Sequence, residues 1–137
     1  MTAPRPGDEI PPLAKDAVTK LQLLHYAGAS GDDNLIHTDV ETARAVGLQD
    51  VIAHGMLSMG FLGQLLTDYA GPGSVRRLAV RFSRMVQLGD RLTCRGVVEK
   101  VDPAEGGATV HLRVFAENQA GERVTEGDAE VWLQTPS

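Results

Sequence analysis

The sequence predicts an α+β fold in which an antiparallel sheet covers one long helix. Three observations predict it: a dense apolar pattern of helical period over residues 55–69, a change to period-two alternation after Gly73, and short turn-forming segments between the alternating runs. The chain has 137 residues, 42% of them hydrophobic, which is enough to bury a core without disulfides or metals. We therefore expect one domain over residues 1–137.

The N-terminal part of the chain is expected to be extended at first and then helical. Residues 1–12 hold four prolines, which oppose helix formation. A helix is predicted over Thr19–Ala29, where Thr19 can act as the N-cap and Leu21 and Leu24 recur on one face.

A polar loop and a second, shorter helix are predicted next. Residues 30–37 begin with Ser-Gly-Asp-Asp-Asn, a composition typical of an irregular loop. Thr38 and Glu41 have the spacing of a capping box, and Gly47 can end a helix. We therefore expect a helix over Thr38–Val46.

The strongest helical pattern covers Gly55–Tyr69, and the segment Gly71-Pro72-Gly73 ends it. Apolar residues surround nearly the whole of this helix, which is typical of a buried one. They are Met56, Leu57, Met59, Phe61, Leu62, Leu65, Leu66 and Tyr69.

Alternation predicts four strands after this helix, separated by turn-forming residues near positions 88–90, 102–107 and 120–121. The residues expected on one face of the strands are Leu78, Val80 and Phe82; Leu92, Cys94, Gly96 and Val98; Val110, Leu112, Val114 and Ala116; and Ala129, Val131 and Leu133. Such a sheet has one apolar face to cover, and the long helix is the obvious cover. An antiparallel sheet wrapped around a long central helix is the hot-dog fold.

Composition excludes several classes of protein. The 18 acidic and 13 basic residues give a net charge of −5, which argues against a nucleic-acid or membrane-surface binder. Cys94 is the only cysteine, so the chain forms no internal disulfide and no cysteine-based zinc site. No apolar segment approaches the ~20 residues that span a bilayer, and no secretory signal is recognised. We expect a soluble, cytoplasmic protein.

The segment from Tyr26 to His37, together with Ala53-His54-Gly55-Met56, carries the functional signal. It resembles the motif of the MaoC-like family, Tyr-Ala-x-x-Ser-Gly-Asp-x-Asn-Pro-x-His followed by Ala/Val-His-Gly-Met, and this family includes the (R)-specific enoyl-CoA hydratases. The chain is similar in particular to the catalytic subunits of actinobacterial 3-hydroxyacyl-ACP dehydratases. Leu35 stands where the motif has proline, which leaves the loop less restricted. The matching positions are Tyr26, Ala27, Ser30, Gly31, Asp32, Asn34, His37 and Ala53 through Met56.

The resemblance implies a hydro-lyase of fatty acid metabolism that adds water to trans-2-enoyl thioesters by syn addition, giving (R)-3-hydroxyacyl thioesters. It implies that Asp32 and His37 hold the catalytic water and that the backbone amide of Gly55 polarises the thioester carbonyl. The substrate is then an acyl-CoA or an acyl-carrier-protein thioester. A homodimer, a higher homo-oligomer or a hot-dog heterodimer is implied as well, because the family places its active site near the subunit interface.

The chemistry of these residue types is consistent with the implied roles. A carboxylate such as that of Asp32 can accept a proton from water, and an imidazole such as that of His37 can complete the transfer near neutral pH. Asn34 can orient the loop or a substrate group through its amide. Gly55 starts the long helix, where backbone N–H groups and the helix dipole stabilise negative charge on an oxygen.

Other residues and functions stay open at the level of sequence. Arg81 and Arg84 either hold the phosphates of the substrate's CoA or phosphopantetheine arm or are simply solvated. His54 is expected to be structural, with a local hydrogen bond at the start of the long helix. Asp32, His37 and His54 have the ligand count but not the spacing of a zinc site, and we expect no metal and no cofactor. The alternative functions are a hot-dog acyl thioesterase and a non-catalytic subunit of a dehydratase heterodimer.

Overall fold

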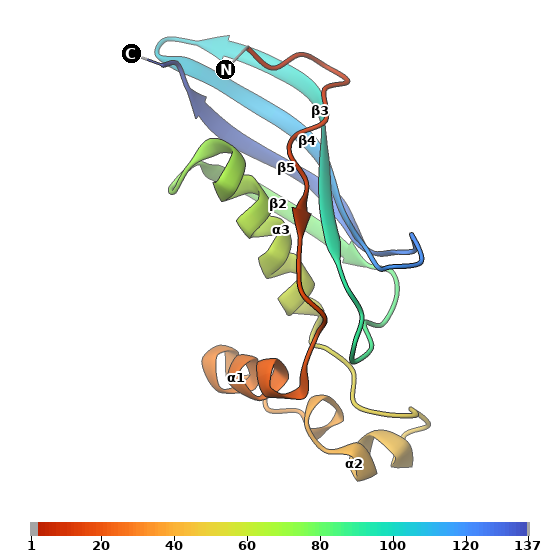
Figure 1. Cartoon of the computed structure of the whole chain (residues 1–137). Helices are drawn as coiled ribbons and strands as arrows, with labels where there is room; N and C mark the ends of the chain where they lie inside the picture. Colours follow the sequence, from red (N-terminus) through yellow and green to blue (C-terminus); the bar gives the residue numbers. More distant parts are fainter. Residues whose placement is uncertain (1–2, 137) are drawn as a thin grey trace.

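The computed structural model describes residues 3–136, which form a five-stranded antiparallel sheet with one long helix against it. The sheet has the strand order β1-β3-β4-β5-β2. Figure 1 shows the long helix α3 along one face of the sheet and the smaller helices beyond one end of it. The elements are β1 (Leu13–Ala14), α1 (Lys20–Ser30), the 3-10 turn η1 (Leu35–His37), α2 (Val40–Ala45), α3 (Gly55–Ala70), β2 (Val75–Phe82), β3 (Thr93–Ala104), β4 (Gly107–Glu117) and β5 (Arg123–Gln134).

The core lies between α3 and the inward face of the sheet, and this hot-dog arrangement confirms the predicted fold. The alternation of β3, β4 and β5 places the predicted residues inward, because successive side chains of a strand point to opposite faces. On the side of α3, the buried apolar residues follow helical spacing. The core residues of these elements are Leu57, Phe61, Leu62, Leu65, Leu66, Cys94, Val98, Val110, Leu112, Val114, Ala116, Val124, Ala129 and Val131.

The expectation that α3 is buried nearly all round is wrong for this single chain. Met56 is 54% exposed, and Gly60 and Gln64 on the same side of the helix are exposed as well. One sheet contacts one side of a helix, so the apolar residues on the other side stay accessible. None of the described helices is long and apolar enough to cross a membrane.

Helix α1 is capped as predicted but buries a different residue. The Thr19 hydroxyl oxygen accepts a hydrogen bond from the Gln22 amide at 3.1 Å. Leu23 is fully buried, whereas Leu21 and Leu24 are 61% and 48% exposed. The apolar face predicted for this helix was therefore the wrong one, because α1 lies at the end of the sheet and packs on the core through Leu23 and the partly buried Tyr26.

The segment between α1 and α3 also differs from its prediction. Residues expected to be irregular include the turn η1, for which Asn34 is the N-cap. Thr38 ends that turn, so it does not start a helix, and the predicted capping box with Glu41 is not formed. Helix α2 begins after Asp39 instead, and Gly47, at a φ of +96°, follows it as expected.

The edge strands depart most from the alternation pattern. Phe82, expected on the inward face, lies beside Gly55 at the start of α3 but is 49% exposed, because β2 is an edge strand with a neighbouring strand on one side only. Strand β1 is only two residues long, paired with Thr93 and Cys94 of β3, and so carries no alternating pattern that sequence analysis can detect.

Cys94 provides a test of the packing between α3 and the sheet. Its side chain is fully buried, and this burial raises the pKa of the thiol to about 12. Because the thiolate is the reactive form, we predict that a disulfide reagent leaves the native protein unlabelled at mildly alkaline pH and titrates the single thiol in concentrated guanidinium chloride. The labelling reaction is followed by its change in absorbance. Rapid labelling of the native protein would contradict the prediction.

Candidate active site

The loop that carries the sequence motif meets the N-terminus of α3 because backbone hydrogen bonds pin the segment between them. The Ile52 amide donates to the Ile36 carbonyl at 3.2 Å, and the Ala53 amide donates to the Val86 carbonyl at 2.8 Å. The first bond joins η1 to the start of α3, and the second joins that start to the chain that follows β2. His37, on η1, is thereby brought next to Gly55.

Asp32 and His37 face one another across a short gap. A carboxylate oxygen of Asp32 lies 3.8 Å from Nε2 of His37; the histidine is buried, and the aspartate side chain is 52% exposed. Nδ1 of His37 lies 2.7 Å from the Ile52 carbonyl, which can only accept, so Nδ1 carries a hydrogen. The neutral ring then keeps its lone pair on Nε2, toward Asp32. At 3.8 Å the two groups are too far apart for a direct hydrogen bond, and one water molecule can bridge them.

Asn34 orders the loop between these two residues. Its side-chain oxygen accepts a hydrogen bond from the Ile36 backbone amide at 3.1 Å, and the backbone amide of Asn34 donates to the Asp32 carboxylate at 3.3 Å. The Asp32 amide donates to the hydroxyl of Ser30 at 3.1 Å. These short-range bonds hold the loop in a fixed shape and leave the second carboxylate oxygen of Asp32 facing His37.

His54 lies behind the pair, where 1% of its surface is exposed. Its Nε2 donates to the Asp32 carbonyl at 3.0 Å, and its ring stacks on that of His37 with the centroids 3.8 Å apart. The local bond expected of His54 is not formed within the described chain, because this side chain makes no capping hydrogen bond to the first turn of α3. Tyr26 also packs against the His54 ring, with the centroids 4.8 Å apart, and its pKa is raised chiefly by burial and to a smaller extent by the charge of Asp32.

A cavity of about 310 Å³ opens beside His37 at the start of α3. Gly55 and Arg84 contribute to its wall, and much of the remainder is apolar, supplied by Ile52, Ala53, Phe82, Met85 and Val86. Such a combination of an apolar wall with a few polar groups is typical of a small-molecule site. Asp32 and Asn34 do not contribute to the wall of this cavity.

The two candidate arginines differ in position. Arg84 lies at the cavity and forms an ion pair with Glu122 at 3.0 Å, in which both side chains are well exposed. Arg81 is exposed on β2, opposite Glu126 of β5, and does not line the cavity. The structure therefore brings Arg84, and not Arg81, next to the site.

Sequence analysis missed Thr125, a buried residue of β5 that lines the same cavity. Ser58 of α3 donates to the Gly55 carbonyl at 2.8 Å, as expected of a helical hydroxyl, and its oxygen lies 2.6 Å from that of Thr125. Because the Ser58 proton is used on Gly55, Thr125 is the donor in the second bond. These two bonds tie the first turn of α3 to β5. The partners are 67 residues apart, so no local pattern signals their contact.

Asp32, His37 and His54 offer possible metal ligand atoms within 4.8 Å of one another. The two imidazole rings are stacked with only 25° between their planes. Their in-plane lone pairs therefore do not converge on a point about 2 Å from both rings, which a zinc ion requires. This arrangement fits a water-holding pair better than a metal site.

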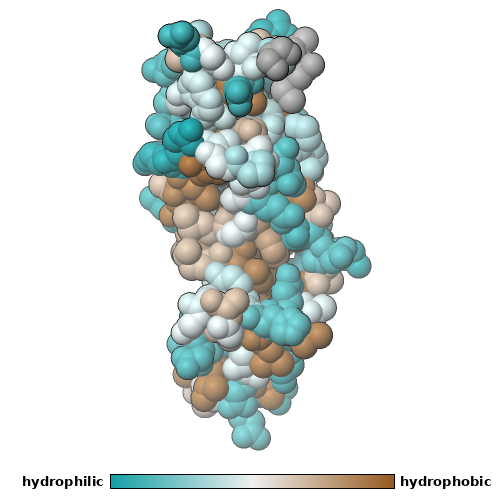
Figure 2. Space-filling view, turned by 90° about the vertical axis from the view of Figure 1, so that its left-hand side faces the viewer, coloured by the Kyte–Doolittle hydropathy of each residue, from teal (hydrophilic) through white to brown (hydrophobic). Residues whose placement is uncertain are grey.

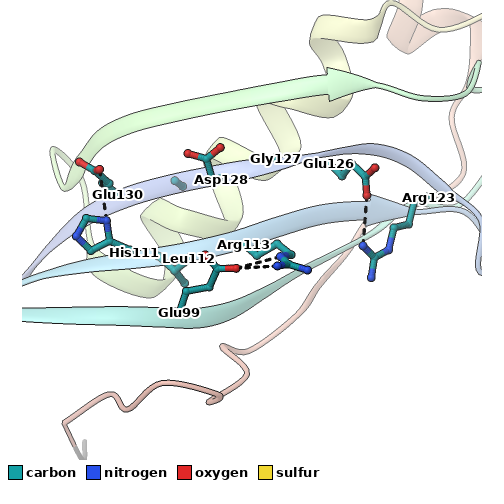
Figure 3. Close-up of a pocket in the computed structure, with 10 residues that line it drawn as sticks. Glu99, His111, Leu112, Arg113, Arg123, Glu126, Gly127, Asp128 and Glu130 are labelled. Carbon is teal, nitrogen blue, oxygen red and sulfur yellow. Dashed lines mark hydrogen bonds and ion pairs between the residues drawn. The ribbon is translucent and has the colours of Figure 1, made fainter.

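A larger hollow of about 520 Å³ lies on the opposite face of the sheet (Figure 3). Its charged side chains are paired. Arg113 pairs with Glu99 of the neighbouring strand at 3.0 Å, His111 pairs with Glu130 of the other neighbouring strand at 3.4 Å, and Arg123 pairs with Glu126 within β5 at 3.3 Å. None of the predicted site residues lines it. It is a solvated sheet face whose charges already have partners, and it is not the candidate site.

Comparison with known proteins gives consistent matches. Residues 2–120 match the family model of the MaoC-like domain. The (R)-specific enoyl-CoA hydratase of Rhodospirillum rubrum is 32% identical over 123 residues, which cover 88% of this chain and 83% of that protein. A UPF0336 protein of Streptomyces avermitilis is 30% identical over 127 residues, which cover 86% of this chain and 85% of that protein. Among solved structures, the unliganded R-hydratase PhaJ1 of Pseudomonas aeruginosa has a TM-score of 0.84 at 28% identity, covering 96% of this chain and 83% of that one.

The hydrogen bond between Thr125 and Ser58, two residues that line the cavity, gives a test of this geometry. Thr125→Val keeps the side-chain shape but removes the donor to Ser58, and we predict a loss of about 1 kcal/mol in the free energy of unfolding, measured by urea titration. Thr109→Val, at a half-buried position of β4, is the matched control and is expected to have little effect. Equal effects of the two substitutions are incompatible with a specific bond at Thr125.

Proposed function

The chain belongs to the MaoC-like dehydratase family, and we propose that it is a hydro-lyase that reversibly hydrates trans-2-enoyl thioesters to (R)-3-hydroxyacyl thioesters. The family match and the R-hydratase neighbour support a hydratase or dehydratase. The observation that carries the more specific proposal is the 3.8 Å gap between the Asp32 carboxylate and the His37 imidazole beside a largely apolar cavity.

In the proposed reaction, the gap between Asp32 and His37 holds the water molecule that attacks C3 of the substrate. The Asp32 carboxylate and Nε2 of His37 are both acceptors, so a water molecule between them donates one hydrogen to each and directs its oxygen lone pairs outward. As this oxygen bonds to C3 of the substrate, Asp32 accepts one proton and the electron pair of the double bond moves toward the thioester oxygen. The proton on Asp32 then passes, by way of the new hydroxyl group, to Nε2 of His37 and from there to C2 on the same side, which returns both groups to their initial state.

The enolate oxygen formed in this step needs hydrogen-bond donors, and we assign the amide of Gly55 to it. Gly55 is the first residue of α3, where the helix dipole stabilises negative charge. A Cβ atom at this position would lie 3.2 Å from the ring of Phe82, so a larger residue would crowd the approach to the amide. The bonds from Thr125 to Ser58 and from Ser58 to the Gly55 carbonyl hold this turn in place.

The rest of the substrate is proposed to follow the cavity and its mouth. The acyl chain packs against the apolar wall formed by residues such as Ile52 and Val86. Arg84 holds a phosphate of the CoA or phosphopantetheine arm, exchanging its exposed partner Glu122 for a stronger acceptor, and Arg81 is the more distant candidate. Adding water neither oxidises nor reduces the substrate, so the proposed reaction needs no cofactor.

We propose that two copies of the chain, or this chain and a similar hot-dog partner, assemble around the site. Large apolar side chains near the cavity are exposed in the single chain, with Met56 at 54%, Phe82 at 49% and Met85 at 58%. Figure 2 shows hydrophobic surface over the middle and lower parts of the face that it presents. Exposed apolar surface of this kind marks interaction sites.

With one free, buried cysteine and no disulfide among the described residues, the chain suits the cytoplasm, which we propose as its compartment.

The hydratase proposal predicts that the acid–base pair is essential. Asp32→Asn and His37→Ala are expected to lower kcat/KM for crotonyl-CoA by about 10²-fold or more, since each removes a proton-transfer group. The measurement is the loss of enoyl thioester absorbance, with chiral analysis of the product. Asp33→Asn, which changes an exposed carboxylate in the same loop, is the matched control and should retain activity.

Four outcomes of this assay would contradict the proposal. Unchanged hydration in the Asp32 and His37 variants would remove the pair from the mechanism, and an (S) product would contradict the stereochemistry. Release of free thiol without loss of the enoyl double bond would identify the alternative, a thioesterase. A chain that hydrates no enoyl thioester by itself but activates a partner would be the non-catalytic subunit of a heterodimer.

The assembly proposal predicts a species with twice the mass of the chain in sedimentation velocity. Phe82→Glu places a charge in the exposed apolar surface, and we expect it to shift the protein toward the monomer because an unpaired charge is costly to bury. A wild-type protein that is monomeric and fully active at the same concentration would refute the assembly.

A further inference from the structure

We propose that His54 is a positioning residue for the acid–base pair, which holds Asp32 through its backbone and His37 through the face of its ring. This inference rests on the proposed function. His54 is almost completely buried and does not line the cavity, so it has no surface with which to touch the substrate. Any effect on the reaction must pass through its neighbours.

The first contact fixes the loop of Asp32 to the helix. Nε2–H of His54 donates to the Asp32 carbonyl at 3.0 Å, across 22 residues of sequence. The bonds of Asp32 with Ser30 and Asn34 lie within its own loop and set the shape of that loop. The bond from His54 sets where the loop sits relative to α3, and therefore where the carboxylate lies relative to the amide of Gly55.

The second contact fixes the plane of His37. The bond from its Nδ1 to the Ile52 carbonyl holds one edge of the ring. The ring of His54, stacked on the ring of His37 with the centroids 3.8 Å apart and 25° between the planes, opposes tilting of that ring, and Tyr26 packs against His54 with the centroids 4.8 Å apart. Together these contacts direct the Nε2 lone pair of His37 toward Asp32, whose carboxylate lies 3.8 Å from it.

Helix capping does not account for a histidine at this position. His54 is the N-cap residue of α3, yet its side chain makes no capping bond to the first turn, and its buried Nδ1 has no hydrogen-bond partner among the described residues. Serine, aspartate and asparagine are the residues that cap helices well. The contacts that the ring does make are with Asp32, His37 and Tyr26, and these are contacts with the site.

Two substitutions separate the two contacts. His54→Gln retains an N–H donor for the Asp32 carbonyl but loses the ring, whereas His54→Phe retains a ring on His37 but loses the donor. We expect each to lower kcat for crotonyl-CoA by about tenfold or more, because small displacements of catalytic groups are costly, while KM stays within about twofold. His25→Gln, which changes an exposed histidine of α1, is the control and is expected to retain both values.

Nuclear magnetic resonance of the histidine rings gives a readout that does not depend on activity. The wild-type protein is expected to show His37 as the Nδ1–H tautomer, contacts between the rings of His37 and His54, and a slowly exchanging Nε2–H signal of His54. Absence of these signals in the unsubstituted protein would overturn the inference even if the variants fail to fold.

The outcomes for the inference and for the proposed function are distinct. Folded His54 variants whose kcat stays within about twofold of wild type would overturn the positioning role, and so would a lower kcat with an equal rise in KM and unchanged His37 signals. A wild-type protein that shows the predicted ring signals but hydrates no enoyl thioester would instead refute the hydratase proposal.

Discussion

The hydrogen bond from Nδ1 of His37 to the Ile52 carbonyl is the interaction on which the rest of the site depends. It fixes the tautomer of the imidazole, so that the lone pair lies on the side of Asp32. It also joins η1 to the segment that leads into α3, in parallel with the backbone bond from Ile52 to Ile36. One short bond therefore sets the chemistry of the ring and brings the ring to the helix terminus. If water replaced the Ile52 carbonyl as the partner of Nδ1, neither the tautomer of His37 nor the position of its ring would be fixed.

The parts of the fold that the sequence predicts well are those governed by local periodicity. The bounds of α3 and the inward residues of β3, β4 and β5 follow from patterns of 3.6 and two residues, because a covered face must be apolar along its length. The close approach of Asp32 and His37 also follows from their shared short loop. For these features, neighbours along the chain carry all the necessary information.

The features that the sequence does not reveal depend on partners far away in the chain. Thr125 meets Ser58 only because β5 passes over the first turn of α3, and the bond from His54 to Asp32 depends on how the loop docks on the helix. The buried residue of α1 is Leu23, although Leu21 and Leu24 fit a helical stripe equally well. Choosing between such faces requires knowing where the helix lies relative to the core, which periodicity does not specify.

Strand β2 lies at the edge of the sheet and bears Arg76, Arg77 and Arg81, all exposed. A free strand edge is a template on which further strands can add, and charged residues are a common protection against such growth. Arg77 is paired with Asp128, whereas two copies that met along the length of β2 would bring the guanidinium groups of Arg76 and Arg81 together. These charges therefore oppose the open-ended ribbons through which exposed sheets aggregate.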